Sequence, residues 1–304
     1  MLWQILLVSR KVDTAYITIS ESYAGNIKDL LIYTLLGKLR KRTVIHLHGG
    51  SFRKSILERS FVLRWLNKHF LKTIGAAIVC GESHKEIFDN LISPKKIHLI
   101  PNFAQDHIFL ELNRVSKKFE DRQQKLRVIY ISGMTEGKGY SRLLAAYEQL
   151  SESSRSRIQI DFAGKFDDNA AETSFLQRIQ YHPNVNYHGT VSGDQKSSLF
   201  YNAHVFCLPT SFNEGQPISI LEAYAAGCVV VTTARPGILD IFKPNENGYL
   251  IPSDDPAPIG RVLDSLAANF KTLESIATHN QKFAEENFRQ NLFCERAAAV
   301  LEKI

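Results

Sequence analysis

The segment from Ala203 to Gly227 restricts the fold more than any other part of the chain. Its first residues, A-H-V-F-C-L, form an apolar run of strand length that ends at Pro209, and a helix-forming run, I-S-I-L-E-A-Y-A-A, follows Pro217. Proline fits the first turn of a helix, and glycine fits its end. A strand, a loop and a helix in this order are typical of a β–α unit in a parallel sheet.

The same alternation of strand and helix patterns recurs on both sides of this segment. Earlier in the chain, short apolar runs predict strands at Val12–Ser20, Thr43–Leu47, Ala76–Cys80 and Lys96–Ile100. Later, they predict strands at Arg127–Ser132, Ile158–Ala163, Val185–Tyr187, Val205–Leu208, Val229–Thr232 and Gly248–Ile251. Strands that alternate with helical patterns predict parallel sheets with helical crossovers. The sequence therefore predicts an α/β fold of two doubly wound, Rossmann-like lobes.

The boundary between the lobes is expected in the stretch from Ala104 to Lys125. This stretch has little apolar periodicity and a charged end, K-K-F-E-D-R-Q-Q-K. Both features are typical of a connection between domains. We therefore assign residues 1–115 to the first lobe and residues 116–282 to the second.

Composition narrows the class of protein. The chain has 304 residues, of which 44% are hydrophobic and 22% are charged, as in globular rather than disordered proteins. The four cysteines form no Cys-x-x-Cys pair, so neither a disulfide framework nor a zinc site is expected. The amino terminus lacks the pattern of a secretory signal, and no apolar stretch has the length of a membrane span. We expect a cytoplasmic protein, soluble or peripheral on the membrane.

Positive charge is concentrated in the first lobe. The net charge is +6, but residues 1–115 carry 17 Lys/Arg and 9 Asp/Glu, whereas the remainder carries 20 and 22. Ten basic residues lie between Lys38 and Lys72, where Glu58 is the only acid. Residues 52–72 also carry large apolar groups at helical spacing, and basic amphipathic helices bind anionic membrane surfaces. We predict membrane contact here; a core-packing helix with a solvated basic face is the alternative.

The loop and the helix that follow the strand at Val205–Leu208 contain groups that can bind a phosphorylated ligand. A helix that begins near Pro217 leaves the backbone amides of Ile218 and Ser219 without intrahelical acceptors, and such an end attracts phosphate. Gly215 lets a ligand approach the backbone. Glu214 lies in the loop and Glu222 inside the helix, so the two carboxylates can reach different parts of one ligand.

A glycine-rich turn, G-M-T-E-G-K-G, follows the strand at Arg127–Ser132. It begins at Gly133, and its lysine, Lys138, supplies a positive charge for a phosphate group. A helix cap with a solvated lysine is the alternative. Gly164 and Gly189 follow the next two predicted strands, at the edge where open α/β sheets bind ligands. Ordinary turns at strand ends carry glycines as well.

The order of residues from Cys207 to Gly227 resembles the donor-site motif of the family 4 (group 1) retaining glycosyltransferases. The shared order is a strand, Pro-x-Ser, Glu-Gly-x-Pro, an aliphatic pair, Glu-Ala, small residues and glycine. The resemblance is strongest from Val128 to Ile251 and weaker before Ile100. It implies the GT-B fold, in which two Rossmann-like lobes face a cleft and the terminal helix, here residues 283–304, packs back on the first lobe.

The resemblance also implies roles for individual residues. Glu214 would contact the donor sugar near its reacting face, Glu222 would hold the ribose hydroxyls, and His48 would contact the sugar from the first lobe. Lys138 would act with Glu214 and His48 in catalysis and would clamp the donor diphosphate. Further donor-binding residues would be Gly133, Gly215, Gln216, Pro217, Ile218, His188, Gly189 and Thr190.

Two departures from the family pattern affect these expectations. The arginine that accompanies the clamping lysine is replaced by Met134, so the clamp would depend on Lys138, the helix amides and Lys165. Only about forty residues precede the His-Gly segment, which implies a shortened first lobe. A naturally short enzyme, a fragment whose start lies upstream and a subunit completed by a partner chain all stay open.

We therefore predict a retaining glycosyltransferase that moves a sugar from a nucleotide-diphosphate donor to a glycan or lipid-linked acceptor in polysaccharide, lipopolysaccharide or capsule biosynthesis. No Asp-x-Asp motif occurs, so we expect metal independence, no bound cofactor and no nucleic-acid partner. The alternatives are a weakly catalytic, membrane-docked subunit of a glycosyltransferase complex and a nucleotide-sugar epimerase or glycan phosphorylase. Paired carboxylates also occur in glycoside hydrolases, but the phosphate-binding helix end argues against that class.

Overall fold

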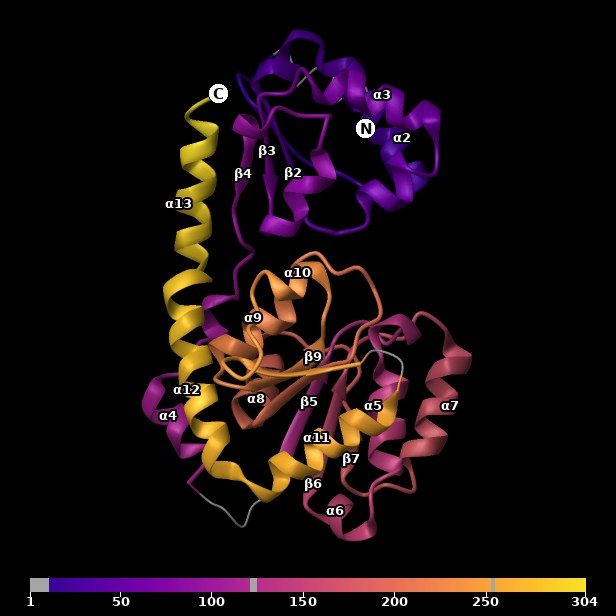
Figure 1. Ribbon diagram of the computed structural model, residues 1–304, viewed down its shortest axis with the longest axis vertical. Helices are drawn as coiled ribbons and strands as arrows, with labels where there is room; N and C mark the ends of the chain where they lie inside the picture. Colours follow the sequence, from indigo (N-terminus) through magenta and orange to yellow (C-terminus); the bar gives the residue numbers. More distant parts are fainter. Residues whose placement is uncertain (1–10, 121–124, 253–254) are drawn as a thin grey trace.

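The computed structural model describes residues 11–120, 125–252 and 255–304. The amino-terminal residues considered above for a leader, and part of the charged stretch before Lys125, lie outside these ranges. Figure 1 shows two lobes, one above the other, joined by the chain that follows β4 and by the C-terminal helices.

The first lobe contains a parallel sheet with the strand order β1-β2-β3-β4. Its strands are β1 (Ala15–Thr18), β2 (Thr43–Leu47), β3 (Ala76–Val79) and β4 (Ile97–Leu99). Its helices are α2 (Tyr23–Leu36) and α3 (Phe61–Leu71), with short helical turns at Gly37–Arg42, Arg53–Leu57, Glu82–Phe88 and Pro94–Lys96. When parallel strands follow one another in sequence order with right-handed crossovers, the connecting helices all lie on one face of the sheet. The apolar side chains on the opposite face must therefore be buried by another segment of the chain.

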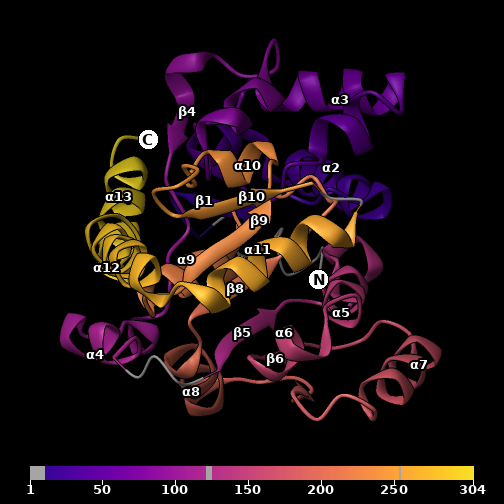
Figure 2. The same cartoon turned by 60° about the horizontal axis from the view of Figure 1, so that its bottom comes forward.

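The C-terminal helix α13 (Gln290–Leu301) covers that second face. Ile45 and Leu47 of β2 pack in the core that α2 and α3 share, whereas Val44 packs on the opposite face with Val300 of α13. Every residue of β2 is therefore buried, as expected for a strand covered on both faces. Figures 1 and 2 both show α13 beside β4, at the end of a helical arm that rises from the second lobe.

Residues 52–72, whose apolar groups have helical spacing, form two helical elements. A π-helical turn at Arg53–Leu57 is followed by α3. Ser60 separates them: its backbone is extended, and its hydroxyl accepts a hydrogen bond from the Leu63 amide. Serine in this position caps a new helix, so the sequence itself specifies the break. None of the described helices has the length and apolar character needed to span a membrane.

The second lobe contains a parallel sheet with the order β10-β9-β8-β5-β6-β7. Its strands are β5 (Leu126–Ile131), β6 (Ile158–Ala163), β7 (Val185–Tyr187), β8 (Val205–Leu208), β9 (Val229–Thr233) and β10 (Gly248–Ile251). Its helices are α4 (Leu112–Lys117), α5 (Tyr140–Glu148), α6 (Glu152–Ser156), α7 (Asn169–Ile179), α8 (Gly193–Asn202), α9 (Ile218–Ala225), α10 (Pro236–Leu239), α11 (Pro256–Ala268) and α12 (Phe270–Asn287), with short turns at Asp106–Ile108 and Glu136–Lys138. This is the doubly wound order of nucleotide-binding sheets.

The second lobe begins earlier than the boundary expected from the sequence. Ala104, Ile108, Leu110 and Val115 are buried in the core of the second lobe, and α4 packs against α12. These apolar residues anchor a segment that is largely irregular, so their spacing follows neither the strand period nor the helix period. The segment therefore resembles a linker in sequence although it belongs to the core.

Two buried histidines predict that the fold loses stability in acid. His46 lies on the sheet face that α13 covers, stacked on Phe293 with ring centroids 6.1 Å apart. His204 accepts a hydrogen bond from the Arg127 amide and donates one to the Lys118 carbonyl. Burial lowers the pKa of His46 to about 3 and the pKa of His204 to about 3. Below about pH 6.5 the unfolded chain therefore takes up protons that the folded chain excludes.

The free energy of unfolding should hold its full value above about pH 6.5 and fall by about 1.4 kcal/mol per pH unit for each histidine below it. At about pH 5.5 the two histidines together should lower it by roughly 3 kcal/mol relative to about pH 8. Urea denaturation at the two pH values measures the loss. His204→Gln can keep both hydrogen bonds but cannot be protonated, so it should remove about half of the loss; an unchanged loss would rule out His204 as its source.

Candidate functional site

The strand order places the candidate site at the centre of the second lobe. β5 and β8 are neighbours, but the chain leaves β5 toward β6 on one side and leaves β8 toward β9 on the other. Loops that diverge in this way leave a crevice at the carboxyl edge, where open α/β sheets bind ligands. The loop after β5 carries Lys138 and the loop after β8 carries Glu214, so both residues lie at this switch point.

A pocket of about 390 Å³ lies between this crevice and the first lobe. Its second-lobe lining is Lys138, Phe212, Asn213, Glu214, Gly215, Gln216 and Pro217, and its first-lobe lining is Glu21, His48, Gly49 and Ser51. Six of the residues selected from the sequence therefore share one pocket: His48, Lys138, Glu214, Gly215, Gln216 and Pro217. The others do not line it: Gly133, His188, Gly189, Thr190, Ile218 and Glu222.

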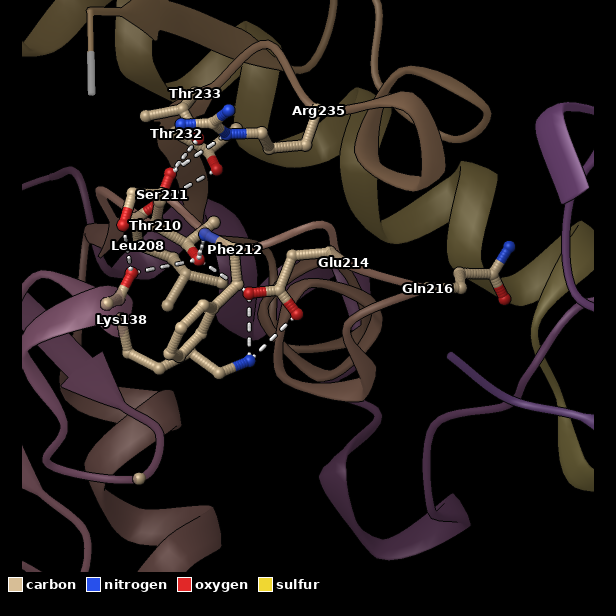
Figure 3. Close-up of polar contacts among 12 residues, drawn as sticks. Lys138, Leu208, Thr210, Ser211, Phe212, Glu214, Gln216, Thr232, Thr233 and Arg235 are labelled. Carbon is tan, nitrogen blue, oxygen red and sulfur yellow. Dashed lines mark hydrogen bonds and ion pairs between the residues drawn. The ribbon is translucent and has the colours of Figure 1, made fainter. Parts of the chain in front are cut away.

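An ion pair between Lys138 and Glu214 forms one wall of the pocket. Lys138 Nζ lies 2.8 Å from both carboxylate oxygens of Glu214, and the Thr210 hydroxyl donates to Oε1 of the same carboxylate at 2.6 Å. Glu214 is only 8% exposed. Figure 3 shows the Lys138 side chain reaching past Phe212 to this carboxylate. The cation and the anion of the site therefore neutralise each other.

The turn that carries Lys138 is tied to the loop after β8. The carbonyl oxygen of Gly137 accepts hydrogen bonds from the Ser211 amide at 2.7 Å and from the Ser211 hydroxyl at 3.1 Å. Arg142 of α5 donates to the carbonyl of Pro209 at 2.7 Å. These bonds fix the two loops to each other, so the backbone of Lys138 has a defined position relative to Glu214.

Gly215 is required because the first lobe packs directly on it. A Cβ atom at Gly215 would lie 1.8 Å from the carbonyl oxygen of His48, and one at Gly50 would lie 2.7 Å from the carbonyl oxygen of Glu214. A Cβ at Gly237 would lie 1.5 Å from the carbonyl of Gly215. The sequence predicted that Gly215 lets a ligand approach the backbone; in the structure the group that approaches Gly215 is the backbone of His48 in the first lobe.

Gln216 joins the two lobes, and its side chain does not point into the pocket. It is 4% exposed; its side-chain oxygen accepts from the Asn102 amide at 2.6 Å, and its side-chain nitrogen donates to the Cys80 carbonyl at 3.1 Å. Asp240 of the second lobe accepts from the hydroxyl of Ser83 at 2.6 Å. The loops of both lobes are therefore held against each other around the site.

Glu222 is separated from the pocket. It is 2% exposed and pairs with Lys196 of α8, whose Nζ lies 2.5 Å from its Oε1. Burial raises the pKa of Glu222, although Lys196 acts against this. Ile218, the first residue of α9, is 48% exposed. No signal in the sequence marked Lys196, because it occupies an ordinary position on an amphipathic helix.

The loop after β7 is also engaged with its own lobe. His188 Nε2 lies 2.8 Å from Oδ1 of Asp161 on β6. Gly189 has a φ of +64°, and its carbonyl accepts from the Gly164 amide at 2.8 Å, whereas Thr190 is exposed. Of the three residues selected here, only His188 thus has an ionisable group, and that group is paired with Asp161.

Met134 occupies the position where the family pattern has an arginine, and its side chain supplies no positive charge. Its side chain is 2% exposed and lies in the second-lobe core, and its amide donates to the carbonyl of Lys165 at 2.9 Å. Gly133 beside it is exposed. Among the described residues that line the pocket, Lys138 is the only lysine or arginine. Positive charge at this site therefore depends on one side chain and the start of α9.

One group of described residues is close enough to hold a metal ion: His46, His48 and Cys80. The ring centroids of His46 and His48 lie 3.8 Å apart, with the ring planes tilted by 34°, whereas the centroids of two imidazoles on one tetrahedral zinc ion would be about 5 Å apart. Burial raises the pKa of the Cys80 thiol to about 12. His48 Nδ1 and Cys80 Sγ both lie near Oδ1 of Asn102, at 3.3 and 3.5 Å. The group fits a hydrogen-bonded network better than a metal site.

Sequence comparisons show which known proteins this chain resembles. A family model described as glycosyl transferases group 1 matches residues 113–283, more than half of the chain. The putative colanic acid biosynthesis glycosyltransferase WcaL of Salmonella typhimurium is 25% identical over 59% of this chain and 45% of its own length. The capsular polysaccharide biosynthesis glycosyltransferase CapM of Staphylococcus aureus is 25% identical over 77% of this chain and 63% of its own. The chain thus spans less than half the length of WcaL.

Solved structures confirm the expected GT-B fold. Anabaena HepE in complex with UDP superposes with a TM-score of 0.80 at 15% identity, over all of this chain and 82% of that one. The sucrose-phosphate synthase of Thermosynechococcus elongatus superposes with a TM-score of 0.75 at 16% identity, over 99% of this chain and 76% of that one.

Proposed function

Because the chain belongs to the group 1 glycosyltransferases, we propose that it transfers a sugar, with retention, from a nucleoside-diphosphate sugar to a glycan or lipid-linked acceptor. The observation that carries the proposal is the pocket at the β5/β8 switch point, where Lys138, Glu214 and His48 converge from both lobes. Relatives named for colanic acid, capsular polysaccharide and amylovoran biosynthesis support a role in surface polysaccharide assembly.

In this proposal the diphosphate lies against Lys138 and the start of α9, where a cation and free amides stabilise the charge that develops on the leaving group. The sugar then occupies the pocket between Glu214 and His48. The bond from the anomeric carbon to the phosphate oxygen breaks, the acceptor oxygen bonds to that carbon on the same face, and the leaving phosphate takes the acceptor proton. Partial burial lowers the pKa of His48, so its neutral ring can hydrogen-bond a sugar hydroxyl.

A second reading is a partner-dependent or weakly catalytic subunit of a glycosyltransferase complex. The observation that favours it is the burial of Met134, which leaves the diphosphate with one cationic side chain, Lys138, among the described residues that line the pocket. Under this reading nucleotide sugars bind, but transfer by the isolated chain is slow.

Calorimetric titration with UDP-, GDP- and ADP-sugars tests the proposal, with each titration run in EDTA and in Mg²⁺. One donor should bind equally well in both, because no metal is required. We propose that the ribose hydroxyls replace Lys196 as the partner of Glu222, so Glu222→Ala should weaken binding about tenfold, and Lys138→Ala by about as much or more. The control is Glu246→Ala, an exposed second-lobe carboxylate. No binding by any donor would overturn the proposed function.

We further propose that the protein works at the cytoplasmic face of the membrane and contacts lipid through α3. Phe61 is 74% exposed, Val62 62% and Trp65 59%. Arg64 and Lys68 lie on the same solvent-facing side of the helix, opposite the buried residues Leu63, Asn67 and Leu71. Exposed aromatic groups interleaved with cations match an anionic lipid surface.

Flotation with vesicles of neutral phosphatidylcholine, with and without anionic phosphatidylglycerol, tests this contact. The protein should float with anionic vesicles and be released by salt, because surface charge attraction is screened. Phe61→Ser with Trp65→Ser should reduce binding about tenfold or more. A matched control changes Leu176 and Tyr181, exposed apolar residues of the second lobe, to serine. Equal losses in both double variants would argue against a specific surface.

A further inference from the structure

Glu21 is a carboxylate of the pocket that no sequence motif marked. It lies between β1 and α2, at the carboxyl edge of the first-lobe sheet, and lines the pocket with His48 from the first lobe and with Lys138 and Glu214 from the second. The carboxyl edges of the two sheets thus each bring one glutamate to the same space.

The Glu21 carboxylate is held in place by backbone groups. Its Oε1 accepts hydrogen bonds from the Ser51 amide at 2.7 Å and from the Phe52 amide at 2.8 Å. It also lies over the backbone of Gly49, where a Cβ atom would be 1.8 Å from Oε2. The glycine therefore makes room for the carboxylate, which is fixed before any ligand arrives.

The second oxygen of Glu21 has unused hydrogen-bonding capacity. Within the described residues, no group donates a hydrogen bond to Oε2, whereas Glu214 accepts from both Lys138 and Thr210. A carboxylate that faces a sugar-sized pocket binds ring hydroxyl groups, which are hydrogen-bond donors. Glu21 also lies in the wall opposite the second-lobe crevice, where the nucleotide is expected.

We propose that Glu21 binds hydroxyl groups of the transferred sugar and so contributes to donor selection. This inference rests on the proposed function. It assigns to Glu21 the sugar part of the donor and no part of the nucleotide. It therefore separates the affinity of the complete donor from that of its nucleoside diphosphate.

The test compares the nucleotide sugar that binds in the titrations above with its nucleoside diphosphate. Glu21→Gln keeps an oxygen that can accept from the Ser51 and Phe52 amides but removes the charge. The variant should bind the nucleotide sugar about tenfold more weakly and the nucleoside diphosphate unchanged. Glu58→Gln, an exposed carboxylate of the same lobe outside this pocket, is the control.

Two results would overturn the inference. Equal weakening of both ligands would show that Glu21 only supports the loop that carries Ser51. Unchanged affinity for both would show that the sugar lies elsewhere. Failure of the proposed function is distinguishable from both, because the unmodified protein would then bind no nucleotide sugar at all.

Discussion

The Glu214→Gln variant should bind the nucleoside diphosphate about tenfold more tightly than the unmodified protein, yet transfer sugar roughly 100-fold more slowly. The reason is the ion pair. Lys138 Nζ lies 2.8 Å from both carboxylate oxygens of Glu214. An arriving diphosphate therefore competes with Glu214 for Lys138, the only lysine or arginine among the described residues that line the pocket. Two unit charges about 8 Å apart interact by roughly 2 kcal/mol at an effective dielectric constant of about 20, and this repulsion disappears with the charge of Glu214.

Calorimetry with UDP, or with the diphosphate of whichever donor binds, measures the affinity, and a donor-consumption assay measures transfer. Lys138→Ala should change the diphosphate affinity in the opposite direction, since it removes the cation itself. Glu246→Gln is the matched control, because Glu246 also pairs with a lysine but on an exposed surface. If Glu214→Gln weakened diphosphate binding as Lys138→Ala does, the ion pair would be a device that orients Lys138 and not a competitor.

The sequence predicted the parts of this site that depend on strand order. Alternating strand and helix patterns predict two parallel sheets, and a parallel sheet can place strands that are not consecutive in the sequence side by side, with their carboxyl ends at one edge. The resemblance to the group 1 glycosyltransferases assigned Lys138 and Glu214, far apart in the chain, to one site, and the strand order explains why their loops meet. Gly215 was predicted as a point of close approach for a ligand, but the group that approaches it is the His48 carbonyl.

The remaining site residues depend on side-chain contacts that leave no periodic signal. Gln216 was assigned to ligand binding, but it bonds to Asn102 and Cys80 of the other lobe. The pairing of Lys196 with Glu222 joins two helices whose packing the sequence does not specify. Glu21 was not selected because a single acid before a helix resembles an ordinary first-turn residue. Motifs identify residues near the backbone of a site, whereas long side chains that cross between elements require the structure.

Lys118→Met is expected to lower the free energy of unfolding by about 3–5 kcal/mol, the largest stability loss predicted for a single change. Lys118 follows α4, and its ammonium group donates to the carbonyls of Phe200 at 3.2 Å, Ala203 at 3.0 Å and Ala226 at 2.5 Å. These carbonyls end α8 and α9, where the helix dipoles favour a cation. Burial lowers the pKa of Lys118. Methionine keeps only the apolar stem of this side chain, so the buried carbonyl groups lose the ammonium group as a hydrogen-bond donor.

The loss should be concentrated at the ends of α8 and α9. Urea denaturation measures the global effect, and hydrogen exchange of peptides from α8, α9 and α11 shows where protection falls. Because α9 carries Glu222 and begins at the candidate phosphate site, the variant should also bind nucleotide more weakly under conditions where it is still folded. Lys117→Met is the control, since Lys117 is the exposed last residue of α4, next to Lys118 in the chain. A Lys118→Met protein as stable as this control would mean that water can replace the ammonium group between the two helix ends.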